Sequence, residues 1–146
     1  MWSRWTAALA VVLALAGSLR ADLTKALSEP NLEKRSQLAL ENATAAYKTA
    51  REAYDKGETE RVQSAIAEIG ESVDLAYTSL EKTGKDPRRS PKFFKRAEMS
   101  TRQLLRRLDG MMESMSVADR ALIEKVRGRV ADVHENLLKG IMSKKK

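Results

Sequence analysis

The chain has 146 residues, of which 42% are hydrophobic, 32% are charged and only 5% are aromatic, and it contains no cysteine. This length supports one domain with a hydrophobic core. The scarcity of aromatic residues is atypical of β-sandwiches and barrels, and the absence of cysteine excludes a disulfide-stabilised fold. We therefore expect an all-α protein.

The N-terminal region is typical of a secretory signal peptide. Arg4 precedes an apolar run, Thr6–Gly17, and small side chains follow it, which suits cleavage between residues 18 and 21. The run is shorter than the roughly 20 residues that a membrane-spanning helix needs, so an uncleaved anchor is the weaker alternative. We expect residues 1–21 to be a signal peptide and residues 22–146 to be the folded domain of a bacterial periplasmic or secreted protein, with no transmembrane span.

Four later segments repeat apolar residues three and four positions apart, which is the spacing of one face of an α-helix. The predicted helices span residues 31–56, 59–82, 91–115 and 117–141, with a short extra helix at 22–28. The predicted core positions are Leu40, Ala43, Tyr47, Ala50 and Tyr54; Val62, Ile66, Ile69, Val73, Ala76 and Leu80; Phe94, Ala97, Thr101, Leu104, Leu108, Met111 and Met115; and Ile123, Val126, Val130, Val133, Leu137 and Ile141. Two short links on either side of one longer loop predict an up-down-up-down four-helix bundle of two antiparallel hairpins.

Residues with capping preferences lie at the predicted helix ends. Gly57 suits a left-handed residue that closes the first helix, and Thr59 is expected to cap the second. Ser90 followed by Pro91 predicts the start of the third helix. Ser116 opens a variant of the capping box at the start of the fourth. These residues support the predicted boundaries.

Positive charge is concentrated in one part of the chain. Residues 85–107 hold nine basic and two acidic side chains, whereas residues 22–84 hold eight basic and twelve acidic ones. Positive charge at the start of the third predicted helix opposes the helix dipole, and a function would explain this cost. The basic cluster consists of Lys85, Arg88, Arg89, Lys92, Lys95, Arg96, Arg102, Arg106 and Arg107.

The basic cluster predicts binding of an anionic partner. After export, an anionic envelope polymer, a lipid surface or an acidic protein supplies the negative charge. Few aromatic residues interleave the cluster, which argues against nucleic acid because single-stranded bases need stacking platforms. The alternative is that the cluster pairs with acidic groups of the first two helices or is simply solvated. We expect a non-enzymatic binding or scaffold module of the cell envelope.

Motifs for catalysis and cofactor binding are missing from the sequence. His134 is the only histidine, and Leu138 stands where the second histidine of an HExxH zinc motif is required. The isolated glycines build no phosphate-binding loop. We therefore predict no enzymatic activity and no cofactor. Two alternatives stay open: a periplasmic b-type haem protein using His134 and a methionine, and a self-associating coiled coil.

Polar residues of the first two predicted helices are expected to have no special role. Glu68, Glu71 and Asp74 lie three positions apart, as they would on any solvated helix face, where their pKa values would be ordinary. Asn42 begins a glycosylation pattern, Asn-Ala-Thr, inside a predicted helix. We interpret that match as chance.

Overall fold

The computed structural model describes residues 23–143, and this part of the chain is all-helical. It contains the long helices α2 (Leu32–Asp55), α3 (Thr59–Lys82), α4 (Pro91–Ser114) and α5 (Ala121–Met142), preceded by a short helical segment over residues 23–28. Among these residues, none of the helices has the apolar length that crossing a bilayer demands. The predicted signal peptide lies outside the described residues.

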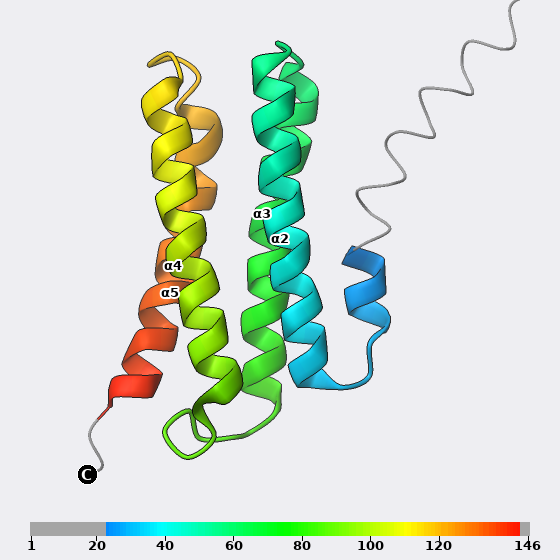
Figure 1. Cartoon of the computed structure of the whole chain (residues 1–146), viewed down its shortest axis with the longest axis vertical. Helices are drawn as coiled ribbons and strands as arrows, with labels where there is room; N and C mark the ends of the chain where they lie inside the picture. The colour runs from blue at the N-terminus through cyan, green and yellow to red at the C-terminus, as the bar shows by residue number, and fades with distance from the viewer. Residues whose placement is uncertain (1–22, 144–146) are drawn as a thin grey trace, which may run out of the picture.

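The long helices are arranged as two antiparallel pairs (Figure 1). α2 pairs with α3, α4 pairs with α5, and the loop over residues 83–90 joins the pairs at the lower end of the molecule in this view. The interface of α2 with α3 is the most extensive, and α2 also contacts α4 while α3 contacts α5. This architecture is compatible with a helical bundle.

Of the two residues predicted to end α2 and to cap α3, one has the expected role and one does not. Gly57 has a φ of 72°, so it adopts the expected left-handed conformation after α2. At the start of α2, the side chain of Asn31 accepts a hydrogen bond from the backbone N–H of Lys34 at 2.9 Å. Thr59 is not a cap: it is the first residue of α3, and Glu58 takes the capping position without a side-chain hydrogen bond.

The start of α5 is a second difference. The first three long helices begin and end within one residue of their predicted bounds, but α5 begins at Ala121, four residues later than predicted. The reason is a turn over residues 117–120. Ser116 stabilises this turn, because its hydroxyl accepts the backbone N–H of Asp119 at 3.2 Å and its carbonyl accepts the N–H of Arg120 at 3.2 Å.

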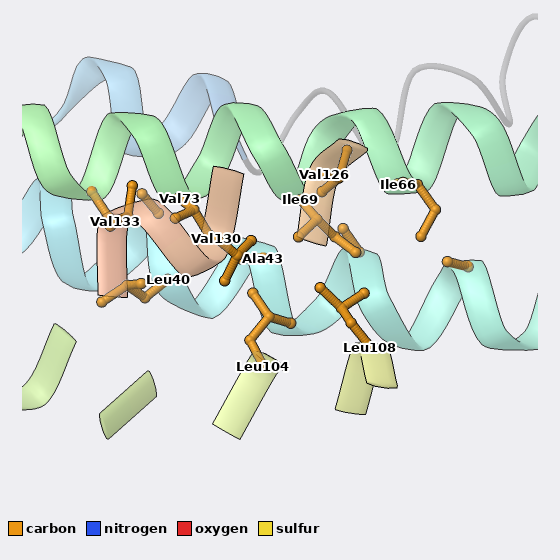
Figure 2. Packing of buried hydrophobic residues seen from close by; sticks show 14 of the residues in the cluster. Leu40, Ala43, Ile66, Ile69, Val73, Leu104, Leu108, Val126, Val130 and Val133 are labelled. Atoms are coloured by element: carbon orange, nitrogen blue, oxygen red, sulfur yellow. The ribbon is translucent and has the colours of Figure 1, made fainter. Parts of the chain in front are cut away.

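Apolar side chains from all four long helices meet between the two pairs (Figure 2). Every predicted core residue of α3 is buried, as are those of the third predicted helix and all those of α5 except Ile141, which is half-buried. The prediction for α2 was incomplete. Tyr47 and Tyr54 are only half-buried, and a stripe of small residues that the prediction left out is fully buried: Ala39, Ala46 and Ala53.

Small residues explain the extensive interface of α2 with α3. Ala39, Ala46 and Ala53 lie seven positions apart on α2, and Ala65 and Ser72 have the same spacing on α3. Side chains of this size let two helix backbones approach closely. The first helical hairpin is therefore packed through alanine and serine, whereas larger side chains fill the space toward α4 and α5.

Candidate functional site

The loop between α3 and α4 is held by two ion pairs that use members of the basic cluster. Lys85 pairs with Glu33 at the start of α2. Arg88 pairs with Asp86 at 3.1 Å and also donates a hydrogen bond to the carbonyl of Ser143 at 3.4 Å. The hydrogen bonds from Arg88 lower the pKa of the Asp86 carboxyl below its ordinary value. The positive charges of Lys85 and Arg88 are thus partly neutralised within the chain.

The first turn of α4 carries positive charge without a compensating carboxylate. Ser90 caps the helix by position but its side chain makes no capping hydrogen bond, and Pro91 is the first helical residue. The turn contains no acidic residue. The cations of Lys92 and Arg96 lie 5.4 Å and 5.7 Å from the centre of the Phe93 ring. These cation–π contacts orient two basic side chains but leave their charge in place.

Two members of the cluster, Arg96 and Arg107, contact side chains of α2. Arg96 donates a hydrogen bond to the side-chain oxygen of Gln37 at 2.8 Å. The guanidinium of Arg107 lies 5.9 Å from the centre of the Tyr47 ring, and the Tyr47 hydroxyl donates to the Arg107 carbonyl at 3.1 Å. Both arginines therefore help to join α4 to α2 through neutral partners.

The basic cluster also contains one further paired cation and several exposed cations without a carboxylate partner. Arg102 pairs with Glu98 at 3.3 Å. The exposed members of the basic cluster with no carboxylate at ion-pair distance, as judged over residues 23–143, are Arg89, Lys92, Lys95, Arg96 and Arg106. Within the same residues, Lys85 is the one cluster member that pairs with an acidic residue of α2 or α3. Acidic residues of α2 and α3 therefore neutralise little of the positive charge of the basic cluster.

Two open depressions follow the line where α4 meets the loop and α2. The larger has a volume of about 460 Å³, and its lining residues are Glu33, Lys85, Ser90, Pro91, Lys92, Phe93 and Lys95. The smaller has a volume of about 250 Å³ and lies between α2 and α4 around Arg96. Glu33 pairs with Lys85 there, so the ammonium groups of Lys92 and Lys95 beside the Phe93 ring favour an anionic group with an apolar part in the larger depression.

His134, on α5, contacts the side chain of Glu98 on α4. Its Nε2 atom lies 3.0 Å from an Oε1 atom of Glu98, the same carboxyl group that Arg102 contacts. Coordination of a haem iron by this nitrogen would require that contact to break. In the part of the chain that the structure describes, no three acidic or histidine side chains gather closely enough to hold a metal ion.

The expectation that Glu68 is solvated was wrong. Its side chain lies between α2 and α3 and the residue is only 7% exposed, because α3 is covered by more than one neighbouring helix. The side-chain amide of Asn42 donates to Glu68 at 3.1 Å and to Ser72 at 2.9 Å. This burial closes the Asn42 amide to glycosylation, in agreement with a chance match. Glu71 is exposed and Asp74 forms an ion pair with α5.

Sequence reasoning missed two residues of the basic surface. Phe93 lies between two cations, and Met99 is 60% exposed on the same helix. A signal for Met99 was available, since it lies four residues after Lys95 and three before Arg102, in the repeat of one helix face.

No protein-family model matches this chain, and no curated protein or solved structure shows significant similarity to it. The basic cluster is accordingly the feature from which a function is inferred.

Proposed function

We propose that this chain is an exported, non-enzymatic binding module that holds an anionic partner of the cell envelope against the loop and outer face of α4. In this proposal residues 1–21 are a signal peptide, and the domain over residues 22–146 is an up-down-up-down four-helix bundle that serves as a rigid support. The partner is an anionic envelope polymer, a lipid surface or an acidic protein.

The observation that carries the proposal is the set of exposed cluster cations that have no carboxylate partner within the described residues: Arg89, Lys92, Lys95, Arg96 and Arg106. These cations repel one another, and Lys92 is also repelled by the positive end of the α4 dipole. Both repulsions destabilise the free protein slightly. An anionic partner removes both repulsions. Each basic residue near an anionic surface contributes about 1 kcal/mol to binding.

The test compares two variants of equal net charge. The first, Lys92→Gln, Lys95→Gln and Arg106→Gln, removes three cations from the basic cluster. The second, Lys48→Gln, Lys56→Gln and Lys125→Gln, removes three exposed cations from elsewhere on the surface. Each variant and the parent protein are immobilised and incubated with envelope extract at low and at moderate salt, and the retained polymers, lipids and proteins are identified.

The proposal expects the parent and the second variant to retain the same anionic component, with the retention weakened by salt. At about 1 kcal/mol for each cation, the first variant should bind this component on the order of 100-fold more weakly at low salt. Equal retention by both variants would show that the position of the charge does not matter, and would refute the proposal.

The structure favours neither of the two alternatives. His134 already contacts Glu98 through the nitrogen that a haem iron would use. The apolar stripes that a coiled coil would share between chains are buried within one chain, as residues such as Ile69, Leu108 and Val130 show. We therefore place anion binding ahead of haem binding and of self-association.

A further inference from the structure

The solvent side of α4 carries a stripe of its own. Lys92, Lys95, Met99, Arg102 and Arg106 follow one another at intervals of three, four, three and four residues, and all five are exposed. The stripe extends about 21 Å along the helix at 1.5 Å per residue. It lies on the opposite side of α4 from the buried stripe that begins at Phe94 and Ala97 (Figure 1 shows the helix). We call these five residues the outer stripe.

Exposed carboxylates are missing from the segment of α4 that carries the outer stripe. Between Lys92 and Arg106 the sequence has one acidic residue, Glu98, whose side chain is only 12% exposed and is held by Arg102 and His134. Further cations lie on the flanks, with Arg96 on the side of α2. The positive charge therefore covers a broad surface, which suits a planar array of anions.

The exposed side chain of Met99 favours a lipid surface over a hydrophilic anionic polymer as the partner. Its side chain lies in the middle of the outer stripe and the residue is 60% exposed. A hydrophilic polymer would contact the cations and gain nothing from the thioether. A bilayer offers both chemistries, because anionic headgroups meet the ends of long basic side chains while an apolar side chain between them enters the boundary with the acyl chains.

We infer that the outer stripe docks α4 flat on an anionic lipid bilayer, with Met99 entering the interface between the headgroups and the acyl chains. The inference rests on the proposed function and names its partner. Lys92, Lys95, Arg102 and Arg106 contact the headgroups. The larger depression, beside Lys92 and Phe93, receives a headgroup phosphate at one end of the stripe.

The experiment measures binding to vesicles of defined composition, one set of phosphatidylcholine alone and one set containing 30% phosphatidylglycerol, and to soluble polyphosphate. It uses the chain from Asp22 onward, which contains every residue of the core cluster and omits the apolar run Thr6–Gly17 that would bind lipid by itself. Circular dichroism verifies that this chain and its variants are equally helical. The variants are Met99→Ser, Met99→Leu and, as a control on an exposed methionine outside the stripe, Met142→Ser.

We expect the parent to sediment with the anionic vesicles and not with the neutral ones. Met99→Ser should weaken vesicle binding about five- to tenfold, since it removes part of the apolar transfer of one methionine. The same change should leave polyphosphate binding unaltered. Met99→Leu should retain vesicle binding, and Met142→Ser should bind like the parent.

Two outcomes overturn the inference without touching the proposed function. Anionic vesicles that bind Met99→Ser as tightly as the parent would show that the methionine stays outside the interface. A parent that binds polyphosphate but no vesicles would show that the basic surface binds anions but not a bilayer. Absence of binding to both anionic probes would overturn the inference, and the retention experiment with the two charge variants would then decide whether the proposed function fails with it.

Discussion

Replacement of Asn42 by alanine tests whether the buried polar cluster between α2 and α3 stabilises the protein. The Asn42 amide donates to Glu68 at 3.1 Å and to Ser72 at 2.9 Å, and all three residues are buried. Asn42→Ala deletes both hydrogen bonds and removes a donor from two buried acceptors. No other side chain is changed, so the free energy of unfolding reports on this cluster.

The expected magnitude follows from the two hydrogen bonds. Each contributes about 0.5–1.5 kcal/mol, and a buried acceptor that loses its donor costs about 1–3 kcal/mol. Alanine offsets up to roughly 0.7 kcal/mol of this loss because it has the higher helix propensity. We therefore expect Asn42→Ala to lower the free energy of unfolding by about 2–3 kcal/mol. At about 3–5 °C per kcal/mol for a domain of this size, Tm falls by about 6–15 °C.

The assay is unfolding in guanidinium chloride, followed by circular dichroism, with Asn136→Ala as the matched control. Asn136 is an exposed residue of α5, so its replacement should not destabilise the protein and should stabilise it by up to roughly 0.7 kcal/mol through helix propensity. The slope of the transition should be the same for both variants, which verifies that each unfolds in the same way. Equal stability of the two variants would refute the reasoning, because it would mean that the hydrogen bonds of Asn42 add nothing to the fold.

Three further substitutions test two glycines and the loop before α4. Gly110→Ala should stabilise the protein by about 1 kcal/mol, since Gly110 is an exposed helical residue with no atom within 4 Å of an added Cβ. Gly57→Ala should destabilise it by about 1–2 kcal/mol because of the φ of 72°, and denaturant titrations that give both changes the same sign would contradict this. Arg88→Gln should raise the pKa of Asp86 toward its ordinary value, as measured by NMR titration of the carboxyl carbon, and an unchanged midpoint would count against the ion pair. Because the folded-state pKa of Asp86 is lowered, the pair stabilises the fold above the unfolded-state pKa, and that contribution is lost as pH falls through the folded-state value.

Most of the helical pattern was predictable from the sequence. A helix satisfies its backbone hydrogen bonds locally, so apolar spacing together with residues such as Gly57 and Pro91 marks its extent. The start of α5 was not predictable in this way. Ser116 is favoured both at a helix start and in a turn, and only the surrounding structure selects the turn over residues 117–120.

The sequence by itself determined that positive charge would gather on the loop and α4, because those residues are contiguous in the chain. Tertiary structure decided which of these cations are paired with a carboxylate and which contact a neutral side chain. Lys85 meets Glu33, and Arg107 meets Tyr47, which are residues of α2 more than fifty positions away. Tertiary structure also decided the environment of Glu68. The apolar spacing of α3 alone predicts that Glu68 faces solvent, but α2 covers it. Such contacts depend on how helices pack across long separations in sequence, and local spacing carries no information about them.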